Sequence, residues 1–232
     1  MEAPVRYDLD QAVAHITMDD GKVNVLSPRM LGELNGALDR ATSDGAGAVV
    51  VRGREGVFSA GFDLPTLRGG GTEALAMLQS GFELAERILS FPLPVAMGCT
   101  GHAIAMGAFL LLSGDYRVGV DGLYRITANE VAIGLTLPRA AIEICRQRLS
   151  PAAFNRATIL AEVFSPDDAV VAGFLDRTVE APGLSNEIAG LAAQMVALDT
   201  AAHAATKLRA RSLALQAIRK AIEEDMAEFA PA

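Results

Sequence analysis

The sequence predicts an α/β protein with a largely parallel sheet, and three observations support this. Short apolar runs typical of strands alternate along the chain with longer segments in which apolar residues recur at helical spacing. From Arg139 onward the pattern becomes mainly helical. The 232 residues suffice for one α/β domain with a sizeable core, and 51% hydrophobic with 21% charged residues is typical of a globular rather than a disordered chain.

The first elements are expected to be a hairpin and a helix. Residues 5–9 and 12–18 have the pattern of two short strands. Ser27 and Pro28 predict a helix start, because a serine oxygen caps free amides and proline fits the first helical turn. The apolar stripe of this helix is formed by Leu31, Leu34, Leu38 and Ala41.

Strands and helices then alternate. Strands are predicted at 48–52, 95–98 and 115–120, and helices at 72–91 and 105–113. The triple glycine at 69–71 predicts a flexible segment that could act as a lid. We expect a core over residues 1–180 and a helical C-terminal region over 181–232.

Charge, cysteine usage and the N-terminus argue against several classes of protein. A net charge of −8 disfavours a nucleic-acid partner. Cys99 and Cys145 are isolated, show no metal-ligand spacing and suit buried thiols in a reducing cytoplasm. The first residues contain no apolar signal core, and the longest apolar run, 103–112, is too short to span a membrane. We therefore expect a cytoplasmic protein without a metal and without a membrane partner.

Two turns rich in small residues, 56–64 and 101–109, are the strongest functional signal. Each follows an apolar strand-like run, and glycine and alanine leave backbone amides uncovered. Two such turns facing each other could hold a developing oxyanion. Glu130 adds a carboxylate in apolar sequence surroundings, and burial among residues 131–133 would raise its pKa. Uncovered amides with one carboxylate favour enolate chemistry.

Three motifs in order resemble those of a known family. Residues 58–64, Phe-Ser-Ala-Gly-Phe-Asp-Leu, are similar to F-x-A-G-x-D-[LI]. Residues 94–107 resemble P-V-x-A-x-x-G-x-x-x-G-G-G, and residues 129–138 resemble P-E-x-x-x-G-x-x-P. The chain thereby resembles the crotonase superfamily, the enoyl-CoA hydratase/isomerase family, over nearly its whole length. The resemblance implies a crotonase (ClpP/crotonase-like) spiral of ββα units and a helical C-terminal region that forms trimers, which commonly pair into hexamers.

The resemblance also implies roles for individual residues. The backbone N–H groups of Phe62 and Met106 would form an oxyanion hole, and Glu130 would exchange protons with the substrate. Coenzyme A would be present as part of an acyl-CoA thioester substrate, with no separate cofactor. It would be bordered by Lys22, Asn24, Val25, Ala60, Asp63, Leu64, Gly101 and Lys207. Met106 replaces the usual central glycine of its motif, which narrows the pocket but keeps the N–H.

Phe109 distinguishes between two reactions of the family. Hydration needs water held between two carboxyl groups, and many hydratases of the family carry glutamate at this position and at that of Glu130. One base suffices to move a proton from C2 to C4 of a 3-enoyl thioester. The pattern Asn129-Glu130 also resembles the mitochondrial-type Δ3,Δ2-enoyl-CoA isomerases. We expect Δ3 to Δ2 enoyl-CoA isomerisation; the alternatives are an enoyl-CoA hydratase of fatty-acid oxidation and a catalytically weak acyl-CoA-binding protein.

Other interpretations stay open for several residues. Glu130 could be a structural carboxylate at a helix start, and Asp63 could cap the turn that follows it. Ser59, His102 and Asp115 could form a hydrolase triad, although Ser59 lies in no G-x-S-x-G pattern. A basic run near the C-terminus could be a solvated helix face or could meet the phosphates of coenzyme A: Lys207, Arg209, Arg211, Arg219 and Lys220.

Overall fold

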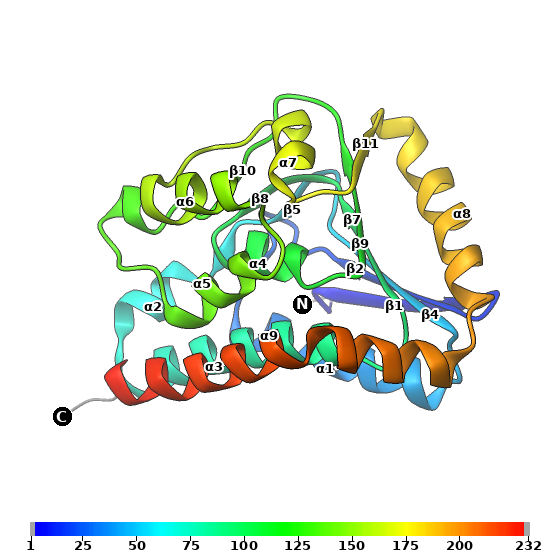
Figure 1. Cartoon of the computed structure of the whole chain (residues 1–232), viewed down its shortest axis with the longest axis horizontal. Helices are drawn as coiled ribbons and strands as arrows, with labels where there is room; N and C mark the ends of the chain where they lie inside the picture. The colour runs from blue at the N-terminus through cyan, green and yellow to red at the C-terminus, as the bar shows by residue number, and fades with distance from the viewer. Residues whose placement is uncertain (1–2, 230–232) are drawn as a thin grey trace.

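A six-stranded sheet forms the centre of the protein, of which a computed structural model describes residues 3–229 (Figure 1). Its strands lie in the order β1 (Val5–Asp10), β2 (Val13–Met18), β4 (Ala48–Arg52), β7 (Val95–Cys99), β9 (Tyr116–Val120) and β11 (Arg177–Val179). The pair β1–β2 is antiparallel, and the other four pairs are parallel. The predicted N-terminal hairpin and largely parallel sheet are confirmed.

A second sheet is built from strands that come directly after strands of the first sheet in the sequence. Its strands β5 (Gly56–Ser59), β8 (Gly101–Ile104) and β10 (Ile126–Thr127) are parallel and lie in the order β10-β8-β5. Strands β5, β8 and β10 come directly after β4, β7 and β9, so the chain advances by one strand in both sheets with each unit. This is the expected spiral of ββα units. A short pair, β3 (Val25–Leu26) with β6 (Gly61–Phe62), joins the first long loop to the first small-residue turn.

Helices cover both faces of the six-stranded sheet. They are α1 (Pro28–Ser43), α2 (Leu64–Gly69), α3 (Gly71–Ser90), α4 (Met106–Leu112), α5 (Arg139–Arg146), α6 (Pro151–Leu160), α7 (Pro166–Ala172), α8 (Leu184–Val196) and α9 (Thr200–Phe229), with one-turn helices η1 (Val131–Ile133) and η2 (Ala181–Gly183). Ser27 caps α1 as predicted, since its hydroxyl oxygen accepts from the Met30 amide at 3.2 Å. Gly70, which has positive φ, separates α2 from α3, and Gly71, the first residue of α3, also has positive φ. In residues 3–229 no helix combines the length and hydropathy needed to cross a bilayer.

Two apolar clusters hold these layers together. The larger draws on both sheets and on α1, α3, α4 and α5, and includes Phe58, Phe82 and Phe109. The smaller lies under α8, where Leu184 and Ile188 pack on the opposite face of the six-stranded sheet. Figure 1 shows α8 on one side of this sheet and the long helix α9 running beside α3.

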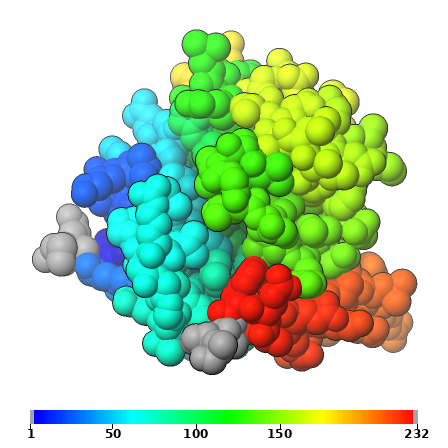
Figure 2. Space-filling view, turned by 90° about the vertical axis from the view of Figure 1, so that its left-hand side faces the viewer, coloured from blue at the N-terminus to red at the C-terminus, as the bar shows by residue number. Residues whose placement is uncertain are grey.

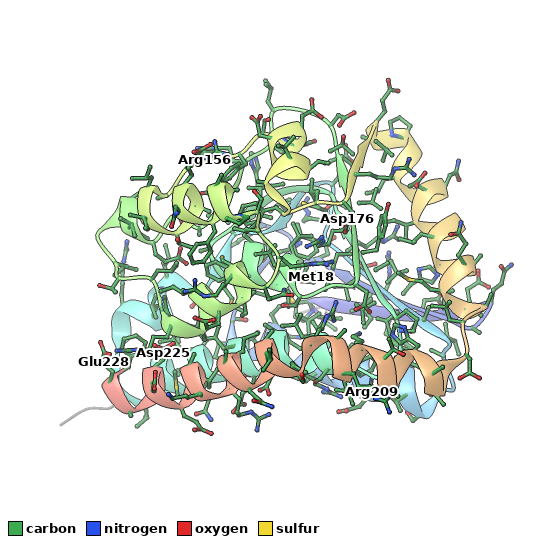
Figure 3. The ribbon with its side chains drawn as sticks, in the orientation of Figure 1. Met18, Arg156, Asp176, Arg209, Asp225 and Glu228 are labelled. Atoms are coloured by element: carbon green, nitrogen blue, oxygen red, sulfur yellow. The ribbon has the colours of Figure 1, made fainter. Side chains whose placement is uncertain are left out.

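Charged side chains attach α9 to the core. Asp225 is fully buried and accepts from the amides of Arg139, at 3.0 Å, and Ala140, at 2.9 Å, at the start of α5 (Figure 3). Glu86 of α3 pairs with Arg219 at 2.7 Å. These contacts join the last helix to two helices that stand far from it in the sequence.

Lys207 and Arg211 correct the expectation that the basic run faces solvent or a coenzyme A phosphate. Lys207 Nζ is buried and donates to Asp115 Oδ2 at 2.7 Å and to Leu93 O at 3.3 Å. Arg211 pairs with the other oxygen of Asp115 at 2.9 Å. Both cations are therefore used inside the protein, whereas Arg209 lies on the exposed side of α9 (Figure 3).

We expect Asp225→Ala to lower the free energy of unfolding by about 3 kcal/mol, because two amides and the Arg139 guanidinium lose a buried acceptor. Urea denaturation followed by circular dichroism measures this change. The control, Glu224→Ala, removes a carboxylate that is 48% exposed on the same helix and should cost less than about 0.5 kcal/mol. Equal losses in the two variants would contradict the role assigned to Asp225.

Candidate active site

The two small-residue turns lie in direct backbone contact. Gly61 has φ +90°, and a Cβ on it would lie 2.9 Å from Ile104 O and 3.3 Å from Met106 N. A Cβ on Gly107 would lie 2.4 Å from Ser59 O. Glycine is required at both positions because any side chain would push the two backbones apart. The close approach brings the amides of the two turns together, as the sequence predicts.

The amide of Met106 opens helix α4 and so has no acceptor within that helix. Ala105, just before it, adopts φ +51° and ψ −125°, a conformation that is rare for a residue with a Cβ. The Ala105 N–H donates to Thr127 O at 2.9 Å, which helps to hold the turn in this form. Backbone strain of this kind clusters at functional sites, and here it directly precedes a predicted oxyanion-hole donor.

Phe62, whose amide is the other predicted donor, is positioned by α3. Its ring packs edge-on against Phe82, with 5.9 Å between the ring centroids. Gly81 leaves room for the ring, since a Cβ there would lie 2.4 Å from Phe62 Cε1. Sequence reasoning missed Gly81, because the need for glycine arises only when α3 packs against β6.

Glu130 follows β10, and its carboxyl group is buried. The residue is 9% exposed, and its Oε2 atom has no hydrogen-bond partner within residues 3–229. Burial raises the pKa of this carboxyl from 4.5 to about 7. Because Thr127 O accepts from the Ala105 amide, the segment that carries Glu130 is attached to the second turn. The segment that carries the carboxylate is therefore tied to the turn that carries one of the two predicted donor amides.

The environment that buries Glu130 differs from the expected one. Val131 and Ile133 belong to η1 and are 44% and 54% exposed, and Ala132 is exposed as well, so these residues do not shield the carboxyl group. Cys145 of α5 is within electrostatic reach of the carboxylate: burial first, and then the charge of Glu130, raise the pKa of the Cys145 thiol. The expected direction of the pKa shift and its expected cause, burial, both agree with the structure, whereas the residues expected to bury the carboxyl group are themselves exposed.

Two further polar atoms on the same segment are buried without a partner in residues 3–229. They are Thr127 Oγ1 and Asn129 Oδ1. Phe109, in contrast, is 1% exposed on α4, so the position at which the resemblance implies a second acid in hydratases carries a buried apolar ring. The segment thus supplies one carboxylate together with an uncharged hydroxyl and an amide.

The loop expected to border coenzyme A is organised by Asp20, which sequence reasoning missed. Its carboxylate accepts from the amides of Lys22, Asn24 and Val25 at 2.8, 2.9 and 3.0 Å. Burial alone would raise the pKa of Asp20, but these hydrogen bonds outweigh it and lower the pKa. Ala60 donates its N–H to a carbonyl of the same loop at 3.0 Å, which ties the loop to the first turn.

Three residues expected to contact coenzyme A have structural roles within the protein. Asn24 is fully buried, and its side-chain amide donates to two backbone carbonyls at 3.0 and 3.1 Å. Gly101 permits close packing of two strands, since a Cβ on it would lie 2.0 Å from Gly56 O. Lys207 is held in the buried ion pair with Asp115. Each of the three residues is thus engaged in hydrogen bonding, close packing or an ion pair within the protein.

The other residues expected at coenzyme A lie around the first turn and are at least partly exposed: Lys22, Val25, Ala60, Asp63 and Leu64. Asp63 also caps α2, because its carboxylate accepts from the backbone amide of Thr66 at 3.1 Å and from the Thr66 hydroxyl at 2.7 Å. Figure 2 shows the surface of α2 and the start of α3, in cyan, beside the green segment around η1, with the red end of α9 below both.

The hydrolase triad considered for Ser59, His102 and Asp115 is not assembled. Ser59 Oγ donates to Asn24 O at 2.7 Å, and His102 Nδ1 accepts from the Arg125 amide at 3.0 Å. Asp115 is engaged in the ion pairs with α9. Within residues 3–229, no three histidine, cysteine or acidic side chains gather closely enough to ligate a metal ion.

Comparisons with known proteins agree on one family. The profile described as enoyl-CoA hydratase/isomerase matches residues 8–230. The human mitochondrial enoyl-CoA delta isomerase 1 is 27% identical over 97% of this chain and 76% of that protein. A probable enoyl-CoA hydratase from Bacillus subtilis is 33% identical over 49% of this chain, and the match spans 45% of that relative's length.

Two solved structures of one Mycobacterium tuberculosis protein are also similar. Both are 50% identical to this chain with a TM-score of 0.94, and they cover 97% and 98% of it and 96% and 100% of their own chains. One is described as a probable enoyl-CoA hydratase and the other as an enoyl-CoA isomerase. The names of the relatives therefore leave the reaction open.

Proposed function

Because the chain belongs to the enoyl-CoA hydratase/isomerase family and has the crotonase fold, we propose that it moves the double bond of a 3-enoyl-CoA thioester to the 2-position. The observation that carries the proposal is the contrast between Glu130 and Phe109. Glu130 is a buried carboxyl with a pKa of about 7, whereas Phe109 is a buried apolar ring where hydration requires an acid. One acid–base group supports isomerisation better than hydration.

The reaction needs a single proton carrier and a site for one negative charge. The Glu130 carboxylate takes the proton from C2, and the electron pair of that C–H bond passes into a dienolate whose charge rests on the thioester oxygen. The same carboxyl group then gives the proton to C4, which leaves the double bond between C2 and C3. The N–H groups of Phe62 and Met106 would donate to the oxygen, each stabilising the transition state by about 3 kcal/mol.

Other features of the site suit this chemistry. A pKa near 7 makes Glu130 a stronger base than an ordinary glutamate while much of it stays ionised at neutral pH. The loop at residues 22–25 and the first turn would border coenzyme A. Three apolar side chains are largely exposed: Ile159 at 61%, Leu160 at 71% and Val163 at 51%. Because another subunit could cover this apolar surface, the proposal includes trimers, or trimers paired into hexamers.

Hydration is the second candidate, and one observation favours it. Thr127 Oγ1 and Asn129 Oδ1 are buried without a partner in the described residues, on the same segment as Glu130. Two such atoms could hold a water molecule beside the carboxylate and replace the missing acid in part. Binding of acyl-CoA with weak catalysis is the third candidate.

One pair of assays separates the candidates. Purified protein is given a 3-enoyl-CoA and, separately, a trans-2-enoyl-CoA, and the conjugated enoyl absorbance is followed. We expect conjugation to appear with the first substrate much faster than it disappears with the second. Faster hydration of the 2-enoyl substrate would overturn the isomerase proposal, and tight thioester binding without either reaction would favour the third candidate.

A further inference from the structure

A cavity of about 460 Å³ lies between α8 and the strands β1, β2 and β4. It is on the face of the six-stranded sheet that α8 covers, and none of the residues that line it belongs to the site around Glu130. Its walls combine charged, polar and apolar side chains. Those that matter for a ligand are Arg6, Asp8, His15, Thr17, Arg52 and Ile188.

The strand register places the polar side chains of this cavity in rows. Arg6 is paired with Thr17, and Thr17 with Arg52, so these three residues form one row across the strands. Asp8 and His15 belong to the next row, two residues further along β1. Since side chains alternate between the faces of a sheet, both rows face α8. The first row therefore places a guanidinium group on each side of one hydroxyl.

Neither arginine of the first row has an ionic partner within residues 3–229. Arg52 Nε donates to Thr17 Oγ1 at 3.1 Å, which orients the side chain and leaves its terminal nitrogens for a ligand. Arg54, two residues further on, does pair with a carboxylate, that of Asp19, at 3.3 Å. Arg6 and Arg52 thus present guanidinium groups without an ionic partner in the described residues, whereas the nearby Arg54 is paired.

An apolar wall stands directly beside Arg52. It is formed by Leu184 and Ile188 of α8, which are 7% and 5% exposed. A Cβ on Gly98 would lie 2.5 Å from Ile188 Cδ1 and 3.3 Å from Arg52 Cβ, so glycine allows α8 to pack this closely. The pKa of His15 is lowered, first by burial and then by the charge of Arg52, which leaves this imidazole neutral at pH 7.

We propose that this cavity binds a small carboxylate that carries a short apolar tail. Arg6 and Arg52 would hold the carboxylate over Thr17, because guanidinium groups match carboxylate oxygens in pairs, and the tail would lie on Ile188. The volume is within the range of small-molecule sites. Asp8, in the next row, and Asp10, which also lines the cavity, would repel a ligand with a second anionic group, which limits the charge to one end.

Calorimetric titration with hexanoate in the presence of saturating coenzyme A tests the proposal. Under the proposed function, coenzyme A fills its own part of the catalytic site, and loss of the remaining heat in the arginine variants below assigns that heat to the cavity. We expect one hexanoate per chain, and Arg52→Gln and Arg6→Gln should each weaken binding about 10-fold or more. The control Arg209→Gln removes an exposed arginine of α9 and should leave the affinity unchanged. Thermal unfolding shows that the variants are folded; Arg6 is exposed, so its substitution does not disturb the core.

Several outcomes would overturn the proposal. Loss of hexanoate binding when coenzyme A is added would assign the ligand to the catalytic site. Inorganic phosphate binding as tightly as hexanoate would show an anion site without a role for the apolar wall. Binding of hexylamine in place of hexanoate would assign the cavity to the acidic side chains. None of the residues that line the cavity belongs to the proposed catalytic site that the thioester assays test. Failure of this proposal is therefore distinguishable from failure of the proposed function.

Discussion

Replacing Glu130 with glutamine is expected to lower kcat for 3-enoyl-CoA isomerisation by about 10²- to 10⁴-fold, the usual contribution of a general acid–base group. The glutamine amide has nearly the same shape but can neither take the proton from C2 nor return it to C4. Stopped-flow or steady-state absorbance at the conjugated enoyl band measures the loss. The control, Glu73→Gln, removes an exposed carboxylate from the start of α3 and should leave kcat unchanged.

The pH dependence gives a second measure of the same residue. The base must be ionised, so kcat/KM should fall about tenfold per pH unit below 7 and level off above it. Glu130→Gln should remove this dependence. A variant that kept the activity and the pH profile of the original protein would contradict the assignment of Glu130 as the base.

As pH rises, the free energy of unfolding should fall over the range in which the activity increases. The folded pKa of Glu130 is raised from 4.5 to about 7, so the folded state holds a proton that the unfolded chain releases. Stability therefore declines as pH rises from about 4.5 to 7, by on the order of 3 kcal/mol, and stays lower above pH 7. Glu130→Gln should abolish that decline, which urea denaturation at pH 5 and pH 8 measures.

Gly61→Ala is expected to lower kcat by about 10²- to 10³-fold, the effect of losing one oxyanion-hole donor. The added methyl would lie 2.9 Å from Ile104 O and 3.0 Å from Ala105 Cβ, so the two turns would have to separate. The amides of Phe62 and Met106 would then no longer converge on one oxygen. Steady-state kinetics should show the loss mainly in kcat, because the charge develops only in the transition state.

The matched control for Gly61 is Gly45→Ala, at the end of α1. Gly45 also has positive φ, +74°, but a Cβ there meets no atom within 4 Å. Both substitutions carry the cost of a left-handed conformation, whereas only Gly61→Ala forces the turns apart. If the two variants lost similar stability and both kept full activity, the contact between the turns would have no role in catalysis.

Much of the fold could be predicted because its signals are local. The cap at Ser27 and Pro28 depends on a few neighbouring atoms, and the alternation of strands and helices depends on periodic apolar residues. The two turns were recognisable for the same reason, since their glycines stand at the positions where backbones approach. Local chemistry of this kind is present in the sequence before the chain folds.

The role of Lys207 could not be predicted from local sequence. A lysine in a basic run suggests a phosphate ligand, but its partner, Asp115, stands 92 residues earlier in the chain. Asn24 was placed at coenzyme A because of its motif, yet its amide is consumed by two backbone carbonyls of other segments. Partners of this kind depend on how distant elements pack, which no local pattern contains.

The sequence by itself determined the order of the elements, the two turns, and the presence of a glutamate at position 130 with phenylalanine rather than a second acid at position 109. Only the tertiary structure decided how these residues behave chemically. Burial raises the pKa of the Glu130 carboxyl group although the residues next to it are exposed, and the register of three strands creates the row of Arg6 and Arg52. Side-chain identity is a property of the chain, whereas desolvation and charge pairing arise from segments that meet only on folding.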